Sequence, residues 1–449
     1  MTRRKSLSSF LDQPRRLFAS LTARNAASSF FALAWLNLLS FLSIPIYIKL
    51  LGVAEWGLVA ACASLQIVAN FVDAGLSQLV PRLVAQEAHR PSRLRKCIFL
   101  LQRVYVGLGL FIFILLQASA AYLAQDWFQV SNERTGALEL AIRIVSFQFL
   151  FQFVNSLHTG LWHGLQRQVL ANGRACGFGT IKHATALIAM MVGSPQAWVY
   201  ALAFASVALL EMTVNALTVR QMFRRAGTDH EESGIALRPI LKKLATLSSG
   251  VLVGLLVIQL DRVILSRTVD VEDFGVYMVV LTLALAFLQL QAPVTRAYFP
   301  VLVNDLQTSG RISVIHMRRL VIGTVLSATL PALTTCALAP QVLALWLDNA
   351  TIVSVGTGPL RLLLLAVAIN SIYACIYQVI LAKGQAALIL KINTSALLAA
   401  VLVVVVQQSS SGILLGGFIW LSITLTQLTL GLAWLFSQSK KGNPNLDRK

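Results

Sequence analysis

The chain has 449 residues, of which 57% are hydrophobic and only 12% are charged, and its formal net charge is +19. Soluble domains carry roughly 25% charged residues, so this composition excludes a soluble protein of this length. The apolar residues occur in runs of about 20 or more, the length of a helix that crosses a bilayer core. We therefore expect an all-α integral membrane protein.

The predicted elements begin after a polar, basic stretch of 24 residues. The first apolar run is too long for the core of a signal peptide, so we interpret it as a membrane helix. About twelve such helices are predicted in total, and they cover residues 28–50, 56–77, 98–124, 137–159, 175–193, 197–222, 243–266, 273–297, 318–345, 358–381, 386–407 and 412–436.

Basic residues alternate between the turns that join these helices. The turns after odd-numbered helices carry little Lys or Arg, whereas the N-terminal tail and the opposite turns are rich in both, with clusters at 90–96, 220–225 and 238–243. The positive-inside rule then places both termini in the cytoplasm. Because the basic residues flank membrane helices, we interpret them as a topology signal and expect no nucleic-acid partner.

The two halves of the chain look like copies. The sequence EWGL at 55–58 recurs as DFGV at 273–276, an offset of 218 residues, and Pro81 recurs as Pro300, an offset of 219. The predicted organisation is a cytoplasmic basic tail (1–24), a six-helix lobe (25–223), a cytoplasmic linker (224–242), a second six-helix lobe (243–437) and a cytoplasmic tail (438–449). A pseudo-twofold axis along the membrane normal would relate the lobes, with a substrate path between them.

Motifs for catalysis and cofactors are missing from the sequence. It has no P-loop, no HExxH, no CxxC and no GxSxG, and its five cysteines lack metal-ligand spacing. We expect no metal, no cofactor and no enzymatic activity. A duplicated helix bundle without a P-loop for ATP hydrolysis is typical of a secondary transporter.

Charged residues inside the predicted helices are candidates for function, because a charge in hydrocarbon usually faces a cavity or a partner. Basic residues outnumber acidic ones there, which favours an anionic substrate. The candidates for a cationic substrate-binding cavity are Lys182, Arg262, Arg143, Arg296 and Lys391. The candidates for binding a coupling ion are Glu211, Asp261 and Asp73.

Several of these residues have a structural alternative. Lys182 could pair with a carboxylate of its own lobe, such as Glu211. Glu139 precedes Arg143 by four residues, the favourable order for an ion pair on one helix face. Asp261 and Asp73 could serve the packing of neighbouring helices instead of binding an ion.

Short motifs in both halves resemble a known family. They are Pro45, the Leu51-Gly52 turn, Gly57, the DAGL sequence at 73–76 and Pro81-Arg82, and then Asp261 within QLDRVILS, GVY at 275–277 and PVL at 300–302. Over about residues 25–436 the chain resembles the polysaccharide-flippase branch (O-antigen and exopolysaccharide, Wzx-type) of the multidrug/oligosaccharidyl-lipid/polysaccharide exporter superfamily. It differs from lipid II flippases, which have fourteen helices and an Arg-rich first helix.

The resemblance implies a function and a location. The protein would move an undecaprenyl-pyrophosphate-linked oligosaccharide from the inner to the outer leaflet of a bacterial inner membrane by alternating access, with the lipid-linked oligosaccharide, membrane lipids and other polysaccharide-assembly membrane proteins as partners. The alternative is a cation-coupled multidrug exporter of the same superfamily. A membrane polymerase is disfavoured, because the outer turns are too short for a catalytic surface.

Overall fold

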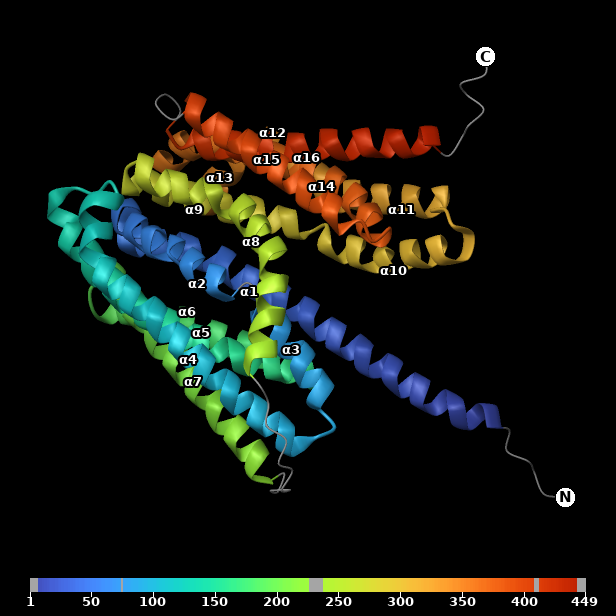
Figure 1. The fold of residues 1–449 in the computed structure, drawn as a ribbon. Helices are drawn as coiled ribbons and strands as arrows, with labels where there is room; N and C mark the ends of the chain where they lie inside the picture. Colours follow the sequence, from blue (N-terminus) through green and yellow to red (C-terminus); the bar gives the residue numbers. More distant parts are fainter. Residues whose placement is uncertain (1–6, 74–75, 226–236, 408–411, 442–449) are drawn as a thin grey trace, which may run out of the picture. The chain divides into compact units, whose positions relative to one another are not determined.

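The structure, a computed structural model, describes residues 7–73, 76–225, 237–407 and 412–441 (Figure 1). Within these ranges the chain is almost entirely helical and contains no β-strand. Ten helical spans in the described part are long and apolar enough to cross a membrane. The expected all-α, multi-pass membrane fold is therefore confirmed.

Where the structure describes the connections between helices, they are short. Their bounds are α1 (Leu7–Ser64), α2 (Gln66–Asp73), α3 (Leu76–Glu87), α4 (Pro91–Tyr122), α5 (Asn132–Gly164), α6 (Gln168–Val192), α7 (Ala197–Arg225), α8 (Leu237–Thr268), α9 (Val271–Gln289), α10 (Ala292–Ser309), α11 (Val314–Thr324), α12 (Leu330–Ala337), α13 (Ala339–Leu347), α14 (Ala350–Ala382), α15 (Ala386–Gln407) and α16 (Leu414–Lys441). Two π-helical turns, Leu123–Trp127 and Val325–Thr329, interrupt the series.

One predicted helix needs a correction, whereas the division between the first two agrees with the structure. The predicted helices 28–50 and 56–77 are separated by a kink at Gly52, where φ is 75° and ψ is 168°. The predicted helix 318–345 breaks after Ala337, because Pro340 lies in the first turn of α13, where its missing N–H costs nothing. The number of twelve membrane helices stays a prediction.

The chain packs into two compact units. Unit 1 contains residues 1–43, 68–119 and 140–247, and unit 2 contains residues 44–67, 120–139 and 248–449. The predicted lobes 25–223 and 243–437 stay a prediction. Much of the predicted linker 224–242 and of the predicted tail 438–449 lies outside the described residues.

In unit 1, small residues allow helices to approach closely. A Cβ atom on Gly160 would lie 2.8 Å from a methyl carbon of Val80, and one on Gly164 would lie 2.7 Å from the carbonyl oxygen of Pro81. These two glycines, one turn apart on α5, therefore give α3 its place against α5. Close approach at small residues is the usual way in which membrane helices gain packing energy.

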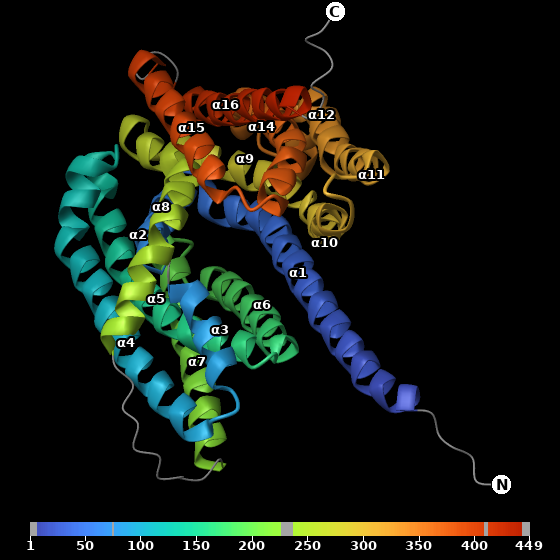
Figure 2. The same ribbon diagram turned by 45° about the vertical axis from the view of Figure 1, so that its right-hand side comes forward.

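In unit 2, α14 is the central helix. It packs most extensively against α16 and α9 (Figure 2). Buried residues recur along its whole length, from Ile352 to Ile380. On α16, Gly416 leaves room for Tyr277 of α9, whose ring would lie 2.4 Å from a Cβ atom at that position. The aromatic ring of Tyr277 is thereby brought to the interior of the unit.

The recurring EWGL and DFGV segments meet inside unit 2. A Cβ atom on Gly275 would lie 2.8 Å from the Cα atom of Gly57, and one on Gly57 would lie 2.4 Å from the carbonyl oxygen of Val271. Corresponding positions of the two predicted copies thus contact each other, as residues close to a twofold axis do. The backbones at this contact leave no space for a side chain.

This contact gives a prediction about stability. Gly275→Ala should lower the stability of the purified protein by about 1–3 kcal/mol, because the added methyl group must displace backbone. The unfolding midpoint in detergent measures the effect. Gly107→Ala is the matched control, since nothing lies within 4 Å of a Cβ atom there and alanine is the better helix former. Equal midpoints for both variants would contradict the close contact.

Candidate functional site

Polar side chains of α5, α6 and α7 form a continuous network inside unit 1. Asn155 on α5 donates to Oε1 of Glu211 on α7 over 3.1 Å and accepts from the Nδ2 of Asn215 over 2.9 Å. Asn215 in turn accepts from the indole of Trp162 over 3.3 Å. Asn155 and Asn215 are buried. The side chains of Asn155 and Asn215 therefore have hydrogen-bond partners within the network, which offsets their loss of water.

Lys182 closes one end of this network. Its Nζ lies 3.0 Å from Oε2 of Glu211, and the two side chains are only 15% and 14% exposed. The structure therefore shows the structural alternative for Lys182, in which it pairs with Glu211 of its own lobe. In this state Glu211 balances the charge of Lys182, so this lysine adds no net positive charge to the interior.

Arg174 lies at the other end of the network. Its guanidinium group donates to the Oδ1 of Asn215 and, over 2.8 Å, to the hydroxyl of Thr218. It also lies over the ring of Trp162, with 5.6 Å between Cζ and the ring centroid. His158 is buried nearby, and its Nδ1 has no hydrogen-bond partner among the described residues. Neutral partners thus hold Arg174 in place while it keeps its charge.

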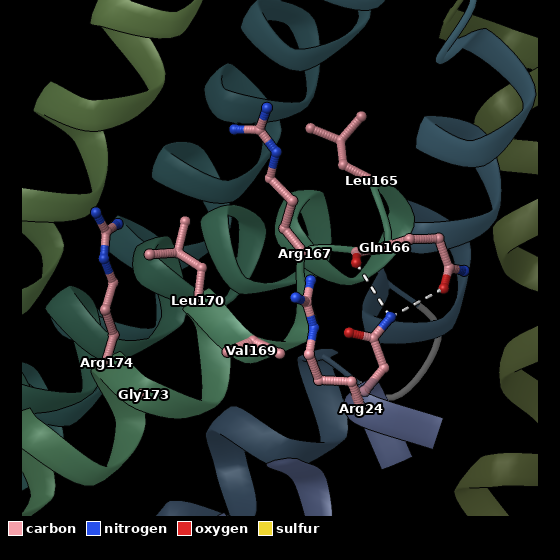
Figure 3. A pocket seen from close by; sticks show the side chains of 9 residues that line it. Arg24, Leu165, Gln166, Arg167, Val169, Leu170, Gly173 and Arg174 are labelled. Atoms are coloured by element: carbon pink, nitrogen blue, oxygen red, sulfur yellow. Dashed lines mark hydrogen bonds between the residues drawn. The ribbon is translucent and has the colours of Figure 1, made fainter. Parts of the chain in front are cut away.

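A pocket opens beside Arg174 at the turn between α5 and α6 (Figure 3). Its volume is about 710 Å³, and three arginines line it: Arg24 on α1, Arg167 in the turn and Arg174 on α6. Leu165, Val169 and Leu170 supply an apolar wall. The amide of Asn25 fixes α1 against the turn by donating to the backbone carbonyl of Gln166 over 3.1 Å.

The pocket has no acidic counterpart. None of its lining residues is acidic. In the part of the chain that the structure describes, no carboxylate forms an ion pair with Arg24, Arg167 or Arg174. Three uncompensated guanidinium groups next to an apolar wall are suited to a phosphate or diphosphate attached to an apolar chain.

In unit 2 the predicted residue Asp261 is almost fully buried, at 1% exposure. Its Oδ2 accepts from the hydroxyl of Tyr277 over 2.5 Å and from the indole of Trp420 over 3.0 Å, while its Oδ1 has no partner among the described residues. Arg262 points to a different partner and donates to Gln259 over 2.7 Å. Asp261 thus joins α8, α9 and α16, in agreement with its structural alternative.

The other predicted residues lie on separate helices. Arg143 on α5 is exposed and donates to the side chain of Gln117 over 3.3 Å, and its pairing with Glu139 stays a prediction. Arg296 on α10 and Lys391 on α15 are exposed. Asp73, at the end of α2, lies close to the hydroxyl groups of Tyr105 and Ser156.

Sequence reasoning missed the arginine pocket and most of the network. Arg167 and Arg174 were interpreted as topology signals, because both lie near a turn between predicted membrane helices. On α7, Glu211, Asn215 and Thr218 are spaced by four and three residues, which is a polar stripe in an otherwise apolar helix. That stripe is the signal that could have revealed the network.

Long apolar helices that carry buried polar networks define a multi-pass membrane protein. Among the described residues, no group of three or more His, Cys, Asp or Glu side chains is placed to hold a metal ion. The family described as "Polysaccharide biosynthesis protein" matches residues 22–304. Because the match covers more than half of the chain, the protein belongs to this family.

Solved structures share the fold. The lipid II flippase MurJ in an inward closed conformation is similar with a TM-score of 0.70 and 12% identity, over 93% of this chain and 87% of that one. An inward-facing multidrug resistance MATE transporter of the MOP superfamily gives 0.61 and 14%, over 90% and 98%. A MOP superfamily transporter from Pyrococcus furiosus gives 0.51 and 14%, over 93% of each chain. No curated protein matches the sequence.

The pair of Lys182 and Glu211 yields a second prediction. Lys182→Gln leaves a mostly buried carboxylate without its partner and should destabilise the protein by about 3 kcal/mol, while Lys182→Gln combined with Glu211→Gln should recover most of the loss. Arg134→Gln is the control, since Arg134 and Glu272 form a pair that is 38% and 53% exposed and should cost less than about 1 kcal/mol. Unfolding in detergent measures all three; additive losses in the double variant would contradict the pairing.

Proposed function

We propose that the protein is a secondary transporter, not an enzyme, that moves an undecaprenyl-pyrophosphate-linked oligosaccharide from the cytoplasmic to the outer leaflet of a bacterial inner membrane by alternating access. Membership of the polysaccharide biosynthesis protein family supports the substrate class. The fold that it shares with MurJ and the MATE transporters supports transport. The observation that carries the proposal is the pocket of three uncompensated arginines.

The pocket fits the diphosphate group of such a lipid and the apolar chain next to it. A polyprenyl diphosphate combines a negatively charged group with a long apolar chain, and the pocket combines Arg24, Arg167 and Arg174 with an apolar wall. Guanidinium groups bind phosphate oxygens through paired, charge-assisted hydrogen bonds. The volume of about 710 Å³ lies in the range of ordinary ligand sites. We infer that the diphosphate first docks here.

The orientation belongs to the same proposal. The pocket lies at a turn that we expect in the cytoplasm, together with both termini, because basic residues favour the cytoplasmic side. A fluorescent protein fused to the C-terminus should therefore fluoresce, because it matures in the cytoplasm and fails to do so when exported unfolded. A dark fusion that is still present in the membrane would reverse the orientation.

The remaining predicted residues take the following parts in the proposal. Arg143, Arg296, Arg262 and Lys391 stay candidates for contacts along the path, as does Lys182 once its partner is neutralised. Glu211 is the favoured coupling residue over Asp261 and Asp73. Opening of the Lys182–Glu211 ion pair would free Lys182, and the Asn155–Asn215 contact connects Glu211 to Arg174 at the pocket.

A cation-coupled multidrug exporter remains the alternative, since MATE transporters share the fold. An organic cation needs acidic or aromatic surroundings, whereas the described pocket presents only positive charge. Loss of the gene discriminates between the two. Trapped lipid-linked repeat units favour the flippase, and broad drug sensitivity with normal surface glycan favours the exporter.

The pocket provides the sharper test in the deletion strain. Complementation with Arg24→Gln/Arg167→Gln should restore surface polysaccharide at least tenfold less well than the wild type, because each lost charge-assisted bond weakens substrate binding by about 1.5 kcal/mol. Both side chains are exposed, so folding should be unaffected. Arg103→Gln, an exposed arginine of α4 that does not line the pocket, is the control. Full complementation by the double variant at equal membrane abundance would contradict the proposal.

A further inference from the structure

Unit 2 contains a second basic pocket that the proposed transport does not use. It has a volume of about 700 Å³ and lies where four helix ends meet: the end of α10, the start of α11, the end of α14 and the end of α16. Figure 1 shows the turn between α10 and α11 on the same side of this unit as the last turns of α16. The pocket therefore lies at one end of the helices of unit 2.

Three cations surround this pocket. Arg311 lies in the turn after α10, Arg318 on α11 and Lys383 directly after α14. Lys383 lies over the ring of Trp434, with 5.2 Å between Nζ and the ring centroid. No carboxylate of the described residues forms an ion pair with any of the three.

Asp305, which precedes the lining residue Leu306, already has other hydrogen-bond partners. Asp305 on α10 accepts from the backbone N–H of Ser313 over 3.0 Å and lies 2.8 Å from Nδ1 of His316. This clamp, together with Gly310 at a φ of 68°, shapes the turn that carries Arg311. The turn thus positions Arg311 at the pocket, and Asp305 forms no ion pair with it.

The rest of the pocket is apolar and opens toward the surface of the helices. Its apolar lining consists of Leu306, Ile312, Val314, Met317, Val321, Ile322, Val379 and Leu435. Several apolar side chains of α11 are strongly exposed, with Val314 at 81%, Ile315 at 62% and Ile322 at 45%. In a membrane protein such residues face acyl chains, so lipid surrounds the mouth of the pocket.

We propose that this pocket binds one anionic phospholipid of the surrounding bilayer, with the phosphate held by Arg311, Arg318 and Lys383 and an acyl chain lying on the apolar lining. Basic pockets between membrane helices at the membrane surface are the usual sites for anionic headgroups. The bound lipid joins α10, α11, α14 and α16, and it is a resident of unit 2, not the cargo.

The test uses the purified full chain in detergent and counts retained lipid by native mass spectrometry, with phosphatidylglycerol and phosphatidylcholine as probes. The wild type should retain one phosphatidylglycerol at concentrations at which phosphatidylcholine is not retained. Arg318→Gln/Lys383→Gln should weaken this retention about tenfold or more. Val321→Trp fills the apolar part without changing the charge and should also abolish it. Arg361→Gln, an exposed arginine on α14 outside the pocket, should retain the lipid like the wild type.

Several results would overturn this assignment. Equal retention of both lipids, or wild-type retention by the double variant and by Val321→Trp, would show that no specific anionic site exists. Displacement of phosphatidylglycerol by inorganic diphosphate would show a phosphate site without a lipid preference, and one-for-one displacement by a polyprenyl diphosphate would assign the pocket to the transported lipid. Unfolding midpoints without lipid confirm that the variants are folded. Since binding is measured without flipping, failure here leaves the proposed transport untouched.

Discussion

The low polarity of the bilayer is the constraint on which the rest of the structure depends. A charge at the centre of a membrane helix costs roughly 2.5–3.5 kcal/mol, so it must find a partner or reach water. The chain meets this constraint in two ways. Deep charges such as those of Lys182 and Glu211 neutralise each other, whereas Arg24 on α1 and Arg167 in the turn before α6 are exposed and have no acidic partner among the described residues.

The positive charge of unit 1 does not lie in the interior of the helices, where the composition of the predicted helices suggests it. An excess of basic residues within the helices predicts a cationic interior, but Lys182 is balanced and Arg262 is hydrogen-bonded to Gln259. In unit 1, three arginines without an ion pair among the described residues line the pocket between α1 and α6. An anionic lipid headgroup would meet that charge on entry, which is where capture of a diphosphate requires it.

The fold was largely predictable from the sequence, because apolar runs of membrane length and the alternation of basic turns are strong local signals. The recurring motif indicated that Gly57 and Gly275 are corresponding positions, but the sequence did not predict that their backbones touch. The partners of Asp261 were not predictable, since Tyr277 and Trp420 lie 16 and 159 residues away along the chain. Arg174 was missed for a similar reason: its role depends on Asn215 of another helix, 41 residues away.

The central claim is that the arginine pocket between α1 and α6 admits an anionic, lipid-linked glycan to a transport path. Reconstitution of the purified chain into vesicles that contain a fluorescent polyprenyl-diphosphate oligosaccharide tests it most directly, with quenching from outside reporting movement between leaflets. The account predicts flipping by the wild type, strongly reduced flipping by Arg24→Gln/Arg167→Gln and no flipping of a cationic lipid of equal chain length. Equal flipping by the double variant, or preferential flipping of the cationic lipid, would contradict it.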